Sequence, residues 1–325
     1  MNWYGRSLAS GCLAALAGLA SLTAQAQSYP TRSITMIVPF AAGGPTDVIA
    51  RIVTGHMAQT LGQNIIIENV VGAGGTTATT RASRAANDGY TLITGHMGTH
   101  AASVPLYPNL AYHPEKSFEP VGLLAGTPIL ILARKDFPPK DLKEFVAYVK
   151  ANETKVNAAH AGVGSVSNVS CELLNSVLGV KPVGVPFNGT GPAMNALVAG
   201  QVDYMCDQIV NAVPQVNGGT IKAYAVATPE RNPSLPNIPT TAEAGLPAFQ
   251  AQAWNAIFAP KGTPADVVAK LNAAVGKALD DEGVRKRLLD LGSVIPGPAD
   301  RTPAALGTLV KNEIAKWTPV LKPVN

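Results

Sequence analysis

Two glycine-rich turns, each lying between an apolar strand-like segment and a helix-like segment, constrain this chain most strongly. The first turn, residues 39–47 (PFAAGGPTD), follows the apolar residues 34–38, and the second, residues 72–76 (GAGGT), follows residues 65–70. A turn of this kind leaves unpaired N–H groups at the N-terminus of the next helix, where the helix dipole is positive. Such a helix end is a binding site for an anion. The two turns therefore predict a cleft that binds a carboxylate through main-chain donors.

The glycines also have a purely structural interpretation, because tight turns often need a positive φ that only glycine adopts without strain. For a single turn that interpretation is the better one. Here a third glycine turn, residues 162–165 (GVGS), lies further along the chain. Three matched turns favour ligand binding.

The N-terminal segment, residues 1–26, has the pattern of a secretory signal peptide. It combines a basic residue at position 6, an apolar run over residues 8–22 and the small-x-small sequence AQA at residues 24–26. A membrane anchor is the competing interpretation, but the apolar run is shorter than the roughly 20 residues that span a bilayer. Lipidation of Cys12 is disfavoured because most of the apolar run follows it. We expect export to the periplasm and cleavage after Ala26.

Length and composition indicate which structural class the mature chain belongs to. Its 299 residues approach the upper limit for one hydrophobic core, so two domains are expected. Hydrophobic residues make up 46% of the whole sequence and charged residues only 14%, with 31 Gly and 26 Pro, which indicates a compact α/β protein and not a disordered one. The net charge of +4 is dispersed along the chain. A nucleic-acid partner is therefore not expected.

Strand and helix patterns alternate, which predicts parallel βαβ units. The first helix should begin at Pro45 and end at Gly62. A strand at residues 128–132 should open a second domain, and the proline-rich residues 229–247 form the clearest linker. Further strands are expected at residues 91–94, 156–159, 183–186, 202–206, 221–227 and 253–259, and further helices at 77–86, 141–150, 167–178, 191–199, 264–279, 282–291 and 302–317.

No catalytic or metal-binding set emerges from the sequence. The second glycine turn lacks the sixth-position glycine of a dinucleotide fingerprint and the lysine of a phosphate-binding loop. His96 and His100 are four residues apart, but no glutamate follows the first of them as it does in zinc proteases. Cys171 and Cys206 are expected to be small buried residues and not a disulfide. We expect no enzyme, cofactor or metal; an exported hydrolase acting on a carboxylate substrate is the alternative.

A set of short motifs spread over nearly the whole mature chain resembles the Bug-type periplasmic solute-binding proteins, the extracytoplasmic receptors of tripartite tricarboxylate transporters. The motifs are YP at residues 29–30, VPFAAGGPTD at 38–47, GAGG at 72–75, DGYTL at 88–92, VPF at 185–187, Gly189, PT at 239–240, EAGLP at 243–247, Trp254, AP at 259–260 and GTP at 262–264.

This resemblance implies an α/β fold of the periplasmic-binding-protein type, a two-lobed clamshell or Venus flytrap whose chain crosses twice between the lobes. Lobe 1 would comprise residues 27–127 plus 253–325, and lobe 2 residues 128–252. The implied function is capture of a small carboxylate, for which we favour a dicarboxylate with an aliphatic or aromatic body, and its delivery to a membrane permease. The receptor is expected to act as a monomer.

The resemblance also implies how the ligand is held: backbone N–H groups and bridging waters of lobe 1 bind a carboxylate, and lobe 2 closes over the far end. One departure is Asn168, where many members carry histidine. Asp47 should shape its loop, Ser165 and Ser167 are as typical of helix caps as of ligand contacts, and Asp207 fits either a structural or a pocket role. The expected ligand-binding residues are Phe40, Ala41, Ala42, Gly43, Gly44, Thr46, Asp47, Gly74, Gly75, Thr76, Thr99, Gly164, Ser165, Val166, Ser167, Phe187 and Asp207.

Overall fold

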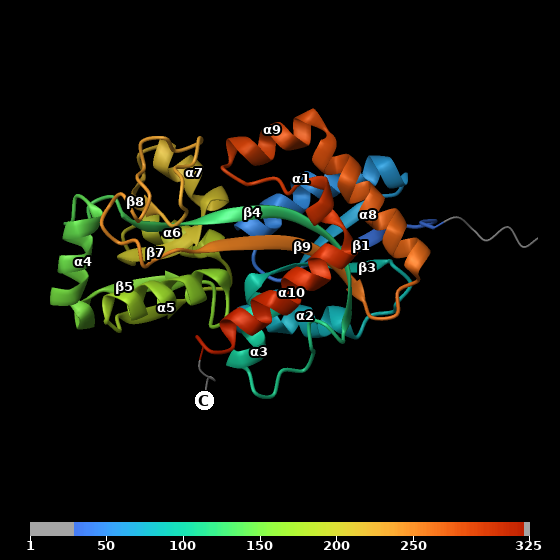
Figure 1. Cartoon of the computed structure of the whole chain (residues 1–325), viewed down its shortest axis with the longest axis horizontal. Helices are drawn as coiled ribbons and strands as arrows, with labels where there is room; N and C mark the ends of the chain where they lie inside the picture. The colour runs from blue at the N-terminus through green and yellow to red at the C-terminus, as the bar shows by residue number, and fades with distance from the viewer. Residues whose placement is uncertain (1–28, 322–325) are drawn as a thin grey trace, which may run out of the picture.

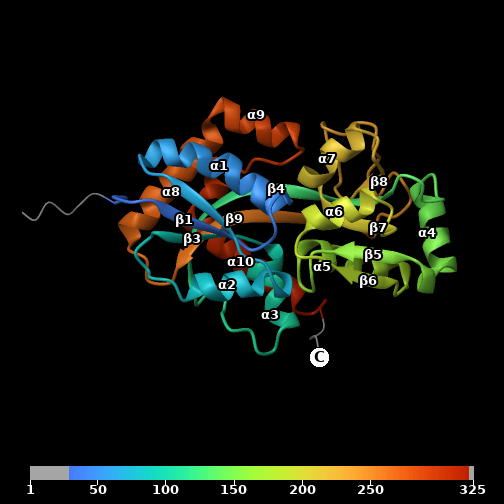
Figure 2. The same cartoon turned by 180° about the vertical axis from the view of Figure 1, so that it is seen from behind.

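The computed structural model describes residues 29–321, so the predicted signal peptide lies outside the described residues. Within them, eight strands form one continuous path of pairing in the order β2-β1-β3-β9-β4-β7-β5-β6, and a ninth strand, β8, pairs with β4. Helices cover the sheet at both ends of this path (Figure 1; Figure 2 shows the opposite side). The mixed α/β class expected from the alternating patterns is confirmed.

The first half of the sheet is built from the predicted βαβ units. Strands β1 (Ile34–Val38), β2 (Ile65–Asn69) and β3 (Thr91–His96) are parallel, with β1 in the centre. Helix α1 (Pro45–Leu61) joins the first two and ends at Gly62, which has a left-handed φ of 69°. Helix α2 (Thr76–Ser83) precedes β3. Because α1 buries its apolar face, the turn in front of it is held at the carboxyl end of β1.

Two long strands, β4 (Phe118–Arg134) and β9 (Gln252–Pro260), join the two halves of the molecule. They are antiparallel from Phe118 opposite Pro260 to Pro128 opposite Gln252. Beyond Pro128, β4 pairs with β7 (Tyr204–Gln208) and β8 (Ile221–Val226) instead. The chain therefore passes between the halves along β4 and β9, as Figure 1 shows.

The predicted strand at residues 128–132 captured only the end of β4. Its first ten residues include Pro120, Gly122 and Gly126, which disfavour strands. Register shifts between Pro120 and Gly122 and between Leu123 and Ala125 accommodate these residues in the pairing with β9. Tertiary pairing therefore overrides the local preference of this segment.

The second half repeats the βαβ arrangement. Strands β5 (Asn157–His160) and β6 (Val183–Pro186) are parallel, and β7 pairs in parallel with β5. The helices of this half, in chain order, are α4 (Leu142–Ala151), α5 (Val166–Leu178), α6 (Thr190–Val198) and α7 (Ile209–Asn217).

Helix α7 was not expected from the sequence. It contains Pro214, which removes a main-chain donor and normally argues against a helix interior. The first turn of α7 precedes the proline, and four of its apolar residues are buried against the sheet. Packing of that face is what stabilises the helix in spite of Pro214.

The proline-rich segment, residues 229–247, is not a linker, which corrects the expectation from its composition. It packs back onto β8, because Val226 N donates to Pro239 O and Thr241 N donates to Val226 O. Leu235 and Thr241 are buried. These contacts make the segment part of the folded domain.

The chain ends with three helices that pack on the first half, α8 (Ala265–Asp280), α9 (Glu282–Asp290) and α10 (Pro303–Trp317). The remaining helical elements are η1 (Ala73–Gly75), the π-helical η2 (Gly98–Ala102), α3 (Ser103–Leu106), η3 (Glu153–Lys155) and η4 (Pro298–Arg301). No helix between residues 29 and 321 is long and apolar enough to cross a membrane.

Cys171 and Cys206 are free and buried, as predicted. The main-chain N–H of Cys206 donates to the Cys171 sulfur at 3.0 Å. Burial raises the pKa of the Cys206 thiol well above its usual value. Both residues therefore act as core side chains of the second half.

Candidate ligand-binding site

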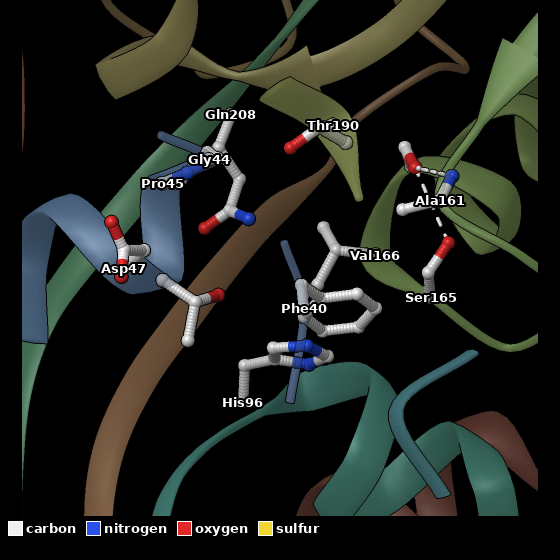
Figure 3. A pocket seen from close by; sticks show the side chains of 12 residues that line it. Phe40, Gly44, Pro45, Asp47, His96, Ala161, Ser165, Val166, Thr190 and Gln208 are labelled. Atoms are coloured by element: carbon white, nitrogen blue, oxygen red, sulfur yellow. Dashed lines mark hydrogen bonds between the residues drawn. The ribbon is translucent and has the colours of Figure 1, made fainter. Parts of the chain in front are cut away.

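The three glycine turns meet at a cleft between the two halves of the molecule. Its inner pocket has a volume of about 20 Å³ and lies where α1, α5 and α6 begin (Figure 3). The inner pocket is lined by Phe40, Gly44, Pro45, Thr46, Asp47, His96, Ala161, Ser165, Val166, Ser167, Thr190 and Gln208.

An outer pocket of about 440 Å³ adjoins the inner one, since Phe40 and Ala161 line both. Its walls come from the second and third glycine turns and from the end of β6. The remaining lining residues are Gly72, Ala73, Gly74, Tyr107, Gly162, Val163, Pro186, Phe187 and Asn188. The cleft thus has a narrow interior and a wider entrance.

The Asp47 carboxylate organises the turn between β1 and α1. Its Oδ2 accepts hydrogen bonds from Gly43 N at 3.0 Å and Arg51 Nε at 2.9 Å, and its Oδ1 accepts one from Asn69 Nδ2 at 2.9 Å. Burial alone raises the pKa of Asp47, but the hydrogen bonds from Arg51, Gly43 and Asn69 outweigh it and hold the pKa below the usual value. Asp47 is therefore ionised at neutral pH and already saturated with donors.

Three helices that begin near the cleft have glycine N-caps, whereas α5 is capped by Ser165. Gly44, Gly75 and Gly189 cap α1, α2 and α6, and none of these ends has a side-chain cap. In α1 the first main-chain bond runs from Val48 N to Gly44 O, so the N–H groups of the first turn remain available for a ligand. The positive ends of the helix dipoles add to the attraction that these N–H groups exert on an anion.

No lysine or arginine lines either pocket in the described part of the chain. The nearest base on α1 is Arg51, whose side chain is half exposed and donates to Asp47. The cleft can therefore attract an anion through neutral donors and helix dipoles alone.

His96 adds a neutral donor to the inner pocket. Its Nδ1 accepts hydrogen bonds from Gly98 N at 2.9 Å and Thr99 N at 3.3 Å, which places the ring proton on Nε2. Burial lowers the pKa of His96 to about 3, so the ring is uncharged at neutral pH. The ring stacks on Phe40 with centroids 5.1 Å apart. His96 can thus offer one N–H without bringing a charge.

On the side of the cleft formed by the second half, the serines at the start of α5 form hydrogen bonds with nearby main-chain N–H groups. Ser165 is the N-cap of α5 and accepts from Asn168 N, while Ser167 Oγ accepts from Ala161 N at 2.9 Å (Figure 3). Asn168 accepts from Gly164 N through Oδ1. Asn168 therefore holds the third glycine turn from outside the pocket walls.

The two halves touch across the cleft. Ala41 N donates to Asn188 O at 3.0 Å, and Tyr107 Oη donates to Val163 O at 2.7 Å. A Cβ on Gly74 would collide with the carbonyl oxygen of Val163. These contacts bring the two halves of the molecule together at the mouth of the cleft.

The structure gathers many of the predicted binding residues around the two pockets. Those that line a pocket are Phe40, Gly44, Thr46, Asp47, Gly74, Ser165, Val166, Ser167 and Phe187. The others line neither pocket and remain predictions: Ala41, Ala42, Gly43, Gly75, Thr76, Thr99, Gly164 and Asp207.

Three polar residues that line the inner pocket were not expected from the sequence. Thr190 begins α6, and Gln208 ends β7 directly after Asp207. Both lie at strand-to-helix junctions, the signal that selected the glycine turns. Thr190 has only the single glycines Gly189 and Gly191 beside it, and Gln208 has no neighbouring glycine. His96 was considered only as a metal ligand, and the described residues contain no cluster of histidine, cysteine and acidic side chains that could hold a metal.

Asp207 is fully buried and touches the pocket only through its neighbours. Its carboxylate accepts hydrogen bonds from Asn211 Nδ2 and from Gln208 N at 2.8 Å. Burial raises the pKa of Asp207 to about 7, although donors on Asn211, Gln208 and Thr190 oppose the shift. Asp207 can therefore exchange a proton near neutral pH.

The fold and the cleft together define a periplasmic solute-binding protein. The chain matches the family described as the tripartite tricarboxylate transporter family receptor over residues 49–325. It is 44% identical over 299 residues to a UPF0065 protein of Agrobacterium vitis, covering 92% of this chain and 86% of the relative. It is also 31% identical over 313 residues to the protein BugT of Bordetella pertussis, covering 96% and 95%. The protein belongs to this receptor family.

Solved structures support the same conclusion. The chain is 60% identical to MatC from Rhodopseudomonas palustris with bound malate, with a TM-score of 0.88 over 90% of this chain and 99% of that one. The periplasmic binding protein BugD is 41% identical, with a TM-score of 0.88 over 91% and 100%. The predicted family and two-lobed fold are confirmed, and the protein is a solute-binding receptor and not an enzyme.

The close approach of Gly74 to Val163 predicts that closure tolerates no side chain at position 74. Gly74→Ala should leave each lobe folded but weaken ligand binding at least about tenfold, because the new Cβ forces the Val163 carbonyl away. Calorimetry measures the affinity. Gly62→Ala is the matched control, since Gly62 also has a positive φ but no neighbour near its Cβ. Equal affinity for both variants would show that this contact does not limit closure.

The raised pKa of Asp207 predicts that its proton stabilises the fold. The folded protein holds this proton more tightly than the unfolded chain, whose carboxyl has a pKa of 3.8. The contribution is complete below that pH and is lost as the pH rises through about 7. Between pH 5 and pH 8, the free energy of unfolding of the wild type should fall by roughly 1–3 kcal/mol more than that of Asp207→Asn. Urea unfolding at both pH values gives this difference; parallel profiles would contradict the assignment.

Proposed function

We propose that this protein captures a small dicarboxylate of about four carbons in the periplasm and delivers it to the membrane permease of a tripartite tricarboxylate-type transporter. The observation that carries the proposal is the donor set of the cleft. Helix N-termini capped by glycine face a pocket without lysine or arginine. Such a site recognises carboxylates through N–H groups.

The geometry suits one carboxylate at the N-terminus of α1. A main-chain N–H that donates to a charged acceptor makes a stronger hydrogen bond than one between neutral groups. The donor is also rigid, so little side-chain entropy is lost when the ligand binds. The neutral Nε2–H of His96 lies in the same pocket. It adds a hydrogen-bond donor but no positive charge that would also attract small inorganic anions.

The choice of a four-carbon dicarboxylate comes from the relatives. MatC, at 60% identity, is described with bound malate, whereas a Rhodopseudomonas palustris protein described with adipate is 31% identical. Both ligands are dicarboxylates, and malate is the shorter. We therefore place this chain with the receptors of the shorter acids.

Export and closure complete the proposal. Residues 1–26 would be removed after Ala26, and the mature monomer would consist of a lobe of residues 27–127 plus 253–325 and a lobe of residues 128–252. Contacts from both lobes to the ligand favour the closed form. The permease would then recognise closure as a change in the relative position of the lobes.

A ligand panel tests the proposal. The mature protein should be stabilised by malate and succinate more than by adipate, citrate, acetate or glutamate. At 100 times the dissociation constant, a ligand adds about 2.7 kcal/mol to the free energy of unfolding, which a thermal-shift assay resolves.

Two outcomes of that panel would contradict the proposal. If no dicarboxylate shifts the melting temperature, the cleft does not bind this class of ligand. If glutamate or a monocarboxylate gives the largest shift, the second carboxylate is not recognised. Chloride at matched ionic strength controls for stabilisation by salt alone.

A further inference from the structure

A buried network of polar side chains lies beneath the inner pocket and was not anticipated by the glycine motifs. Gln208 Oε1 accepts hydrogen bonds from Thr127 Oγ1 at 2.7 Å and from Asn255 Nδ2 at 2.9 Å. Asn255 Oδ1 in turn accepts from Thr46 Oγ1 at 3.2 Å. All four side chains are at most 3% exposed. The network therefore belongs to the rigid interior and not to a solvated surface.

The network leaves one pair of donors unused. Both hydrogen bonds to the Gln208 amide go to its oxygen, and no described residue accepts a hydrogen bond from Nε2. Gln208 lines the inner pocket, and Figure 3 shows its amide extending toward the space between Thr190 and Phe40. Among the described residues, Nε2 is not one of the fully buried side-chain atoms that lack a partner, so it stays accessible from the pocket, where a ligand oxygen can accept its hydrogen bond.

The four residues come from elements on both sides of the cleft. Gln208 ends β7 in the second half, Thr46 lies in the first turn of α1, and Thr127 and Asn255 are on β4 and β9, which join the halves. The Gln208 amide is thereby fixed relative to the N-terminus of α1. The distance between the Gln208 amide and the N–H groups at the start of α1 is therefore fixed by the network.

We propose that Gln208 Nε2 donates to a ligand oxygen opposite the N-terminus of α1 and that Thr127, Asn255 and Thr46 are positioning residues that set the ligand length the cleft accepts. This inference rests on the proposed function, because it assigns a second contact to the same ligand. No charged side chain takes part in the network. The hydrogen bond from Gln208 therefore selects ligands by the position of an acceptor oxygen and adds no net charge to the site.

Substitutions of Gln208 test the contact itself. Gln208→Met removes the donor while keeping the length of the side chain, and malate binding should weaken about 10- to 100-fold. Gln208→Glu keeps an oxygen for Thr127 and Asn255 but turns the donor into an acceptor. Its affinity relative to wild type should be lowest at pH 8 and recover toward pH 5.5, because a protonated carboxyl donates again. A merely structural role would not produce this pH-dependent recovery.

Thr127→Val tests the positioning role, since Thr127 lines neither pocket. Loss of its hydroxyl frees the Gln208 amide, so the ratio of malate to adipate affinity should fall at least about threefold. Thr94→Val is the matched control: Thr94 is equally buried, but its hydroxyl has no hydrogen-bond partner in the described structure. Circular dichroism and unfolding curves confirm that each variant is folded.

The outcomes separate this inference from the proposed function. If wild-type protein binds no dicarboxylate by calorimetry, the proposed function fails. If wild type binds malate and Gln208→Met binds it equally well, the Gln208 contact is wrong while the function stands. If Gln208→Met weakens binding but Thr127→Val leaves the malate-to-adipate ratio unchanged, the positioning role of the network is wrong.

Discussion

The hydrogen bonds accepted by the Asp47 carboxylate are the interaction on which the cleft depends. The donors are Gly43 within the turn after β1, Arg51 one helical turn further along α1, and Asn69 at the end of β2. Because these partners satisfy the carboxylate, it does not compete for the N–H groups at the start of the helix. Under the proposed function, the N-terminus of α1 therefore stays free to bind a ligand carboxylate.

The long strands β4 and β9 carry side chains that support the pocket from below. They join the halves as a paired ribbon, and the polar side chains of Thr127 and Asn255 on this ribbon meet Gln208 beneath the pocket. Contacts such as Tyr107 with Val163 close the entrance above it. Under the proposed function, a ligand lies between these two sets of contacts, and its differential contacts with the closed form determine how far the equilibrium shifts.

The sequence predicted those parts of the molecule in which local chemistry and tertiary structure agree. The turn at Gly44, the end of α1 at Gly62 and the buried state of Cys171 and Cys206 follow from local rules. Helix α7 was missed because Pro214 contradicts the local rule and packing overrides it, and the start of β4 was missed because its glycines and prolines are tolerated only through pairing with β9. His96 and Gln208 could not be selected, since the tautomer of one and the free amide of the other depend on partners that only the fold supplies.

A high-resolution structure of the protein with a bound four-carbon dicarboxylate tests the central claim most directly. The account predicts that one ligand carboxylate accepts hydrogen bonds from main-chain N–H groups at the N-terminus of α1, directly or through one water, at about 2.7–3.2 Å. It also predicts that no lysine or arginine nitrogen lies within salt-bridge distance of that carboxylate. A lysine or arginine side chain that moves into the cleft and pairs with the ligand would contradict recognition by backbone dipoles.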